Sequence, residues 1–251
     1  MITQVGGLLR ALRPLFIYNK PMKKIIATLV LALTTLTASY AQYYDNDPVG
    51  TVYEYEMSNK LMGTSTITQT LKKVEGNVIT YEVVTKVPGM KQPMTMENAL
   101  TFADGKIQYS VESLMAQSKA TLEQAGMGSN IDMSFDGEAG FTPLQGKVGD
   151  KLPLTKATIT AKVQGMDLKV ITELTRNEIT AVDEEVTTPA GTFKTIKIEQ
   201  EVKTTTQAMG MNQTQENKQI TWVVPNKGVV KTETTTMGQV MTTQLVKITR
   251  P

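Results

Sequence analysis

The chain has 251 residues and a mass of 27.5 kDa, with 26 Lys and Arg, 24 Asp and Glu, and neither cysteine nor histidine. Those two absences exclude Ser-His-Asp and Cys-His catalysis, thiol redox chemistry, zinc sites of imidazole or thiolate, and Cys-linked lipid anchors. Five cations and no acid lie in residues 1–41, so the body from Gln42 carries 21 cations against 24 acids. A mildly acidic body with dispersed lysines argues against nucleic-acid binding.

Residues 22–41 have the layout of a secretory signal peptide. Lys23 and Lys24 precede a 12-residue apolar run, 25–36, and small residues follow at Ser39 and Ala41. We therefore expect cleavage between Ala41 and Gln42. Because a membrane-spanning helix needs roughly 20 apolar residues, this run predicts no permanent membrane anchor. The mature chain is expected to be soluble in the periplasm or outside the cell.

Residues 1–21 place a second basic and apolar stretch ahead of this leader. The simplest interpretation is a start codon assigned too far upstream, with Met22 as the first residue, because residues 22–41 satisfy the leader pattern by themselves. The alternative is an unusually long leader or an additional amphipathic anchor.

Alternation of apolar and polar residues recurs through the body. In residues 78–87, Ile79 and Tyr81 alternate with Thr80 and Glu82. A period of two is typical of strands with one apolar and one polar face. Four further segments show this period: 157–163, 166–174, 196–203 and 240–248. Because glycine, asparagine and aspartate turn signals separate the segments, we expect a mainly β protein with an antiparallel sheet.

One segment has the period of a helix. Between Ser110 and Gly126, apolar residues recur on one helical face, interrupted by Ser118, and Gly126 stands where a helix would end. We expect one short helix there. The glycine-rich residues 126–149 lack periodicity and predict a loop with one short strand near 130–135. We interpret residues 42–251 as a single β-rich domain, with 126–149 as the boundary if the body has two subdomains.

Three short segments carry a resemblance to a known family. They read Gly-Lys-Val-Gly-Asp-Lys-Leu-Pro at 146–153, Pro-Ala-Gly-Thr-Phe at 189–193, and Trp-Val-Val-Pro-Asn-Lys-Gly-Val-Val-Lys at 222–231. The pattern, over about residues 50–250, resembles an uncharacterised exported β-rich family of bacterial envelopes. The resemblance implies the open half-barrel fold of lipoprotein carriers, in which a curved antiparallel sheet packs on one short helix. The motifs are turns and strand edges, so the resemblance implies no catalytic residues.

Methionine is abundant, with 13 in the 210 residues from Gln42 onward. Flexible, polarizable methionine fills irregular cores and also lines surfaces that accept varied ligands, so both interpretations stay open. In the second interpretation a concave face binds an apolar ligand. The residues expected to line it are Met115, Leu122, Met166, Leu168, Val170, Ile196, Ile198 and Trp222. Trp222 is equally expected to pack against the core with its N–H bonded.

Metal sites have weak support in the sequence. Met90, Met94 and Met96, with Met209 and Met211, are thioether groups of the type that binds Cu(I), but no histidine or cysteine supports them. Acidic clusters at 45–47, 130–136 and 183–185 offer oxygen ligands to Ca²⁺, but each is more simply a solvated turn. We therefore expect no metal and no cofactor.

Two functions from different classes fit the sequence. The first is a non-enzymatic exported binding protein that holds an apolar ligand, a lipid or a lipoprotein segment on a methionine-lined concave face. The second is a structural or interaction protein of the cell envelope whose core is fully packed. A ligand carrier exposes a contiguous apolar patch of a few hundred Å² or more, whereas a packed domain does not.

The leader assignment makes the first testable prediction. The intact mass of the protein recovered from the periplasm or culture medium of its own host should equal that of a chain beginning at Gln42. A mature chain that begins before Gln42 would contradict the cleavage site.

Overall fold

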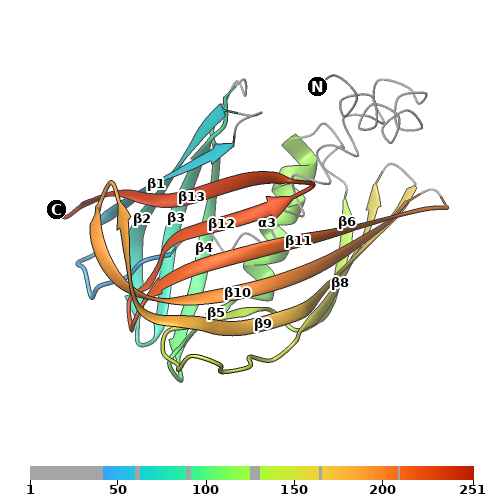
Figure 1. Ribbon diagram of the computed structural model, residues 1–251. Helices are drawn as coiled ribbons and strands as arrows, with labels where there is room; N and C mark the ends of the chain where they lie inside the picture. The colour runs from blue at the N-terminus through green and yellow to red at the C-terminus, as the bar shows by residue number, and fades with distance from the viewer. Residues whose placement is uncertain (1–41, 60–62, 89–91, 125–130, 164–165, 209) are drawn as a thin grey trace, which may run out of the picture.

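The computed structural model describes residues 42–59, 63–88, 92–124, 131–163, 166–208 and 210–251. In this part of the chain, 13 strands form one antiparallel sheet in the order β6-β8-β9-β10-β11-β12-β13-β1-β2-β3-β4-β5-β7. The sheet bends so that β1–β4 stand behind β9–β12 (Figure 1). Because β6 and β7 end the order without pairing with each other, the sheet is open, as the mainly β half-barrel prediction requires.

The strands vary widely in length. Their bounds are β1 Val52–Asn59, β2 Gly63–Glu75, β3 Val78–Lys86, β4 Met94–Ala103, β5 Lys106–Tyr109, β6 Asp132–Gly137, β7 Phe141–Pro143, β8 Lys156–Val163, β9 Met166–Thr188, β10 Gly191–Ala208, β11 Met211–Val224, β12 Gly228–Thr236 and β13 Gln239–Thr249. Four of the five predicted alternating segments lie within strands, and the fifth, 78–87, extends one residue beyond the end of β3. However, β9 and β10 are far longer than expected, because bulges let them continue through a bend.

The predicted helix is confirmed as α3, Val111–Gln124. The Ser110 side chain caps its first turn by accepting a hydrogen bond from the Ser113 N–H at 3.3 Å. Ser118, which interrupts the apolar stripe, is 5% exposed and donates to the Leu114 carbonyl at 2.8 Å. This bond satisfies the hydroxyl inside the protein, so the interruption does not end the helix.

Helix α3 spans the opening of the bent sheet. It packs against β4 and β6, strands that lie near opposite ends of the strand order. Its Ser113 hydroxyl accepts a hydrogen bond from the Ala99 N–H of β4 at 3.3 Å. The helix therefore joins the two halves of the sheet on the side where no strand pairing joins them (Figure 1).

The principal hydrophobic core fills one end of the space between the two halves. Tyr53, Leu71 and Tyr81 come from β1–β3, and Ile198 and Val230 come from β10 and β12. All five side chains are at most 2% exposed. The core joins strands that are distant in the order, so it holds the sheet in its bent form.

The first described residues pack into the turn before β12. The Val229 N–H donates to the Gln42 carbonyl at 2.9 Å, and the Tyr44 N–H donates to the Lys227 carbonyl at 2.8 Å. Gly228 has φ +137°, and a Cβ there would overlap the Gln42 carbonyl. Gly228, in the third family segment, is therefore required for two reasons: its positive φ and the close approach of the Gln42 carbonyl.

The turn of the second family segment closes the same end of the molecule. It forms the bent tip of the β9–β10 hairpin, and the Ala190 N–H reaches the Leu245 carbonyl of β13 at 3.4 Å. The Phe193 ring meets the Tyr43 ring edge to face, with centroids 6.0 Å apart. The hairpin tip and the segment at Gln42 thus cover the core from the same side.

The contact at Gly228 gives the second prediction. Gly228→Ala should lower the free energy of unfolding by about 3 kcal/mol, because the new methyl group adds a backbone clash to an unfavourable φ. Gly210→Ala is the matched control: its φ is +75°, but nothing lies within 4 Å of the added Cβ. Urea denaturation measures both variants, and equal losses of stability would contradict the close-approach account.

Candidate functional site

The strand register divides the sheet into two faces. Partners across a ladder share a face, and neighbours along a strand alternate. In β10 and β11, Ile198 pairs with Thr221 on the inner face, which is the face toward the core, whereas Lys197 pairs with Trp222 on the outer face. The same division follows through every strand pair except at the bent tip, residues 182–195.

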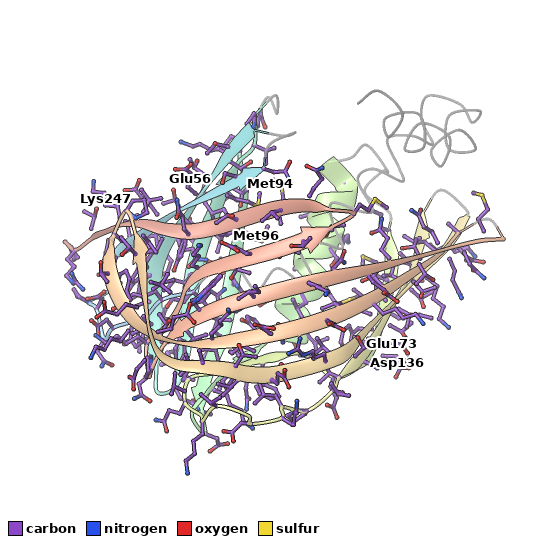
Figure 2. All side chains as sticks on the ribbon, in the orientation of Figure 1. Glu56, Met94, Met96, Asp136, Glu173 and Lys247 are labelled. Atoms are coloured by element: carbon purple, nitrogen blue, oxygen red, sulfur yellow. The ribbon has the colours of Figure 1, made fainter. Side chains whose placement is uncertain are left out.

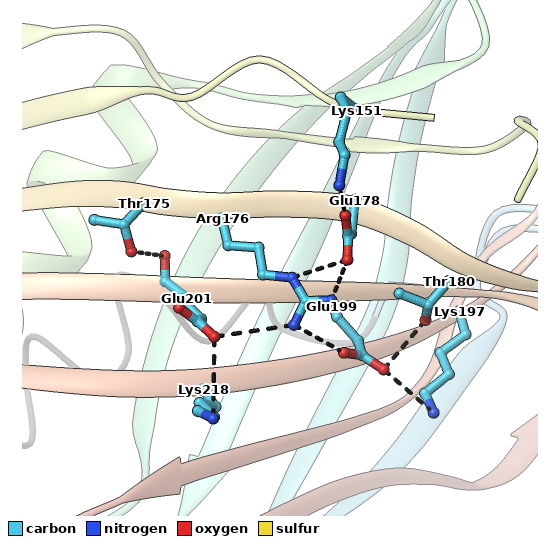
Figure 3. Close-up of polar contacts among 9 residues, drawn as sticks. All are labelled: Lys151, Thr175, Arg176, Glu178, Thr180, Lys197, Glu199, Glu201 and Lys218. Carbon is cyan, nitrogen blue, oxygen red and sulfur yellow. Dashed lines mark hydrogen bonds and ion pairs between the residues drawn. The ribbon is translucent and has the colours of Figure 1, made fainter. Parts of the chain in front are cut away.

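The outer face carries the charge. Arg176 on β9 binds Glu178 through its Nε at 2.9 Å and lies 3.3 Å from Glu199 of β10. Lys197 lies 3.6 Å from the Glu199 carboxylate, and Lys218 lies 4.0 Å from Glu201 (Figure 3). Such partly exposed pairs stabilise the fold by at most about 1 kcal/mol each. Their effect is to favour this register and to keep this face hydrated.

The inner face is free of charge. Apart from residues 182–195, no inner position in the described strand residues is Asp, Glu, Lys or Arg. Figure 2 displays the contrast, with Glu56, Lys247 and Glu173 pointing outward while Met94 and Met96 lie on the inner side. This uncharged surface is the candidate functional site.

Four of the eight predicted lining residues lie on the inner face with resolved side chains. Leu168 and Val170 on β9 are 6% and 3% exposed, and Ile196 and Ile198 on β10 are 3% and 2% exposed. The isoleucines belong to the principal core. Met115 is half-buried on α3. The side chains of Leu122 and Met166 lie outside the described part of the structure.

Trp222 belongs to the same core cluster as Ile196 and Ile198, but the register puts it on the outer face of the sheet. There it packs beneath lysine side chains, with Lys231 Nζ 4.7 Å and Lys197 Nζ 5.9 Å from the ring centroid. Its Nε1–H donates to the Glu184 carboxylate at 3.1 Å, and the residue is 7% exposed. The expectation of a packed, bonded tryptophan is confirmed.

Other methionines line the inner face instead. Met57, Met94, Met96, Met133 and Met241 all occupy inner positions, and all are half-buried. Val240, the first residue of the predicted alternating segment 240–248, lies instead on the outer face and is 48% exposed. The inner residues of β13 are Met241, Thr243 and Leu245 in the pairings to β12 and β1.

The residues considered as metal ligands either have other roles in the structure or lie outside the described residues. Asp45 binds Lys227 at 2.6 Å, and Asp47 binds Arg250 at 2.6 Å and accepts from the Tyr53 hydroxyl at 2.9 Å. These contacts already engage the acids of the 45–47 cluster. Within the described residues, no group of three or more acidic side chains is placed to hold a metal. Met90 and Met209, two of the copper candidates, lie outside the described residues.

A row of amide side chains crosses the inner face, and sequence reasoning missed it. Asn177, Gln200 and Gln219 occupy paired positions on β9, β10 and β11. Gln200 Nε2 donates to Asn177 Oδ1 at 3.1 Å, and Gln219 Nε2 donates to Gln200 Oε1 at 3.1 Å. We call these three residues the amide row. The only sequence signal was a polar residue where the alternation predicts an apolar one, which the bulge in β9 obscured.

Buried tyrosines lie at the end of the inner face that is next to the core. Tyr53, Tyr55 and Tyr81 are at most 1% exposed, and the Tyr53 and Tyr81 rings meet edge to face at 6.2 Å. Burial in apolar surroundings, reinforced by the neighbouring tyrosine rings, raises the pKa of all three phenols well above the usual 10.0. These side chains are therefore neutral wherever the protein is folded near neutral pH.

Within the described residues, no helix is both long and apolar enough to pass through a membrane.

Comparison with known proteins agrees with the three family segments. The family model described as DUF3108-like matches residues 48–245. The chain belongs to the DUF3108-like family. This match confirms the resemblance drawn from the motifs, and all three segments lie inside the matched range. The comparison with curated proteins found no match.

Two solved structures share the fold. One is a putative lipoprotein from Parabacteroides distasonis, with a TM-score of 0.59 and 16% identity, covering 83% of this chain and 99% of its own. The other is a putative exported protein with a YmcC-like fold from Bacteroides fragilis, with a TM-score of 0.54 and 16% identity, covering 84% of this chain and 100% of its own. At this identity the likeness shows the fold alone.

The tyrosine cluster gives the third prediction. A raised pKa in the folded state means that the stability is complete below pH about 10 and decreases above it, as the unfolded chain loses phenolic protons. In that pH range, each of the three tyrosines should lower the free energy of unfolding by about 1.4 kcal/mol per pH unit. Tyrosinate absorbance of these residues should therefore rise together with the loss of the β-sheet circular dichroism signal. Full ionisation of every tyrosine while the sheet signal stays native would contradict the burial account.

Proposed function

We propose that this DUF3108-like protein is an exported envelope protein whose inner face binds an uncharged apolar ligand, with a lipid acyl chain as the chemistry that fits best. The observation that carries the proposal is the division of charge between the faces. A charged group without a partner is costly in an apolar environment, so a face built to contact a lipid chain must lack such groups.

Partial exposure of the inner methionines supports a binding face over a completely packed core. Tyr55 and Leu245, two residues of the principal core, are at most 1% exposed. By contrast, Met57, Met94 and Met241 keep part of their surface accessible on the same face. Methionine side chains change rotamer at little cost, so they suit a surface that adapts to a flexible chain.

Export is supported by three consistent observations. The leader-like pattern ends at Ala41, and the chain from Gln42 onward enters the fold directly. The named neighbours of similar fold are a putative lipoprotein and a putative exported protein. A protein of the envelope meets lipids and lipoproteins, so the proposed ligand class fits the proposed location.

A charge placed on the inner face tests the proposal. We expect wild-type protein purified from its own host to carry bound lipid in native mass spectrometry, and Met241→Lys to lose it, because an ammonium group there opposes an apolar ligand. Met237→Lys is the matched control, since Met237 lies in the β12–β13 turn and is 64% exposed.

Circular dichroism must first show that both variants have the native sheet. If Met241→Lys does not fold, Met94→Lys on β4 makes the same test at another inner position. Wild-type protein that is free of lipid at its native expression level would contradict the proposed function, as would equal lipid content in the inner variant and the control.

A further inference from the structure

We propose that the inner face has a polar subsite at β11 and β12, which binds the uncharged, hydrogen-bond-donating head group of an amphiphilic ligand. The subsite consists of Gln219, Asn217 and Thr232, on the inner side of these strands. This inference rests on the proposed function, because it describes the head group of the ligand whose apolar chain lies on the same face.

The orientation of the amide row is fixed from one end. Asn177 Nδ2 donates to the Pro153 main-chain carbonyl at 2.9 Å, and a carbonyl can only accept. Asn177 must therefore present its Oδ1 to Gln200, and Gln200 must present its Oε1 to Gln219. Gln219 is thus held with its own Oε1 beyond the end of the row.

Three buried polar atoms at this end have no partner among the described residues. They are Gln219 Oε1, Asn217 Oδ1 and Thr232 Oγ1, in side chains that are 2%, 4% and 3% exposed. An unpaired buried polar atom costs about 1–3 kcal/mol, so these three atoms, on two neighbouring strands of one face, are unfavourable unless a ligand pairs with them. Elsewhere in the row, every amide group makes at least one hydrogen bond.

The chemistry of these atoms selects the ligand. Gln219 Oε1 and Asn217 Oδ1 are carbonyl acceptors, and Thr232 Oγ1 both accepts and donates, so the ligand must bring hydrogen-bond donors. Outside residues 182–195, no inner-face position among the described strand residues bears a carboxylate that would neutralise a cationic donor. A neutral hydroxyl-bearing head group meets both conditions, whereas a phosphate lacks donors and has a charge that nothing on this face neutralises.

Apolar side chains adjoin the subsite in the same ladder rows. Thr232 pairs with Thr243, which pairs with Met57 on the next strand. Along the neighbouring row, Gln219 pairs with Thr234, which pairs with Met241. With strands about 4.8 Å apart, these methionines are about 10 Å from the polar atoms in the plane of the sheet. One amphiphile can therefore contact both with its head and the start of its chain.

Three detergents with the same twelve-carbon chain test the head-group selection. Dodecyl maltoside has a neutral head with many hydroxyl donors, whereas dodecyldimethylamine oxide and dodecylphosphocholine have no donor. Titration calorimetry of the folded protein, below the critical micelle concentrations, should give an affinity for the maltoside about tenfold higher than for the other two.

A variant then assigns the preference to the subsite. Gln219→Met removes the acceptor at similar size. It should make the affinity for the maltoside about equal to that for the other two detergents, with the amine oxide affinity unchanged. Gln244→Met is the matched control, because Gln244 lies on the outer face of β13 and should keep the wild-type preference. If Gln219→Met does not fold, Thr232→Val should give the same reduction.

The outcomes separate this inference from the function on which it rests. Binding of all three detergents with equal affinity, or a preference that survives in Gln219→Met, overturns the polar subsite and leaves the apolar binding face in place. Binding of none of the three overturns both.

Discussion

The register of the strand ladders is the constraint on which this structure depends. Because side chains alternate with a period of two, a slip of one residue in any pair would move charged residues to the inside of the bend. The charged pairs around Arg176 and the buried tyrosines of β1 and β3 oppose such a slip from the two faces. The strand register therefore determines both the separation of charge between the two faces and the bent shape of the sheet.

The three family segments act where the bend must be held. The segment 146–153 pairs with β9 beyond the end of β8, with the Leu152 N–H donating to the Asn177 carbonyl at 2.9 Å, and its Pro153 carbonyl orients the amide row. The turn at 189–193 reaches Leu245, and the turn before β12 receives Gln42. All three bring together residues that are distant in sequence, which explains how turns and strand edges can identify a fold.

Much of the fold could be predicted from local pattern. Alternation located five of the 13 strands, β3, β8, β9, β10 and β13, and the spacing of apolar residues located α3, because both signals depend on neighbours in the sequence. The faces were harder to predict, since bulges such as the one at Glu201 and Val202 change which residues share a side. Trp222 was among the predicted lining residues of the concave face, but the register places it on the outer face, where its N–H bonds to Glu184.

The amide row could not be predicted, because its members lie on three strands and their orientation depends on a main-chain carbonyl. The methionines of the inner face were recognised as a group by composition, but their positions required the pairing of β1, β4 and β13. The positions of the site residues thus depend on pairing between strands that are distant in sequence, whereas the positions of the helix and strands depend on local sequence pattern.

Methyl NMR of protein labelled at its methionine methyl groups tests the central claim most directly. Addition of dodecyl maltoside should shift the signals of Met57, Met94, Met96 and Met241 on the inner face and leave that of Met237, in the exposed turn, unchanged. Shifts that are equal at Met237 and at the inner methionines, or confined to Met237, would contradict binding on the inner face.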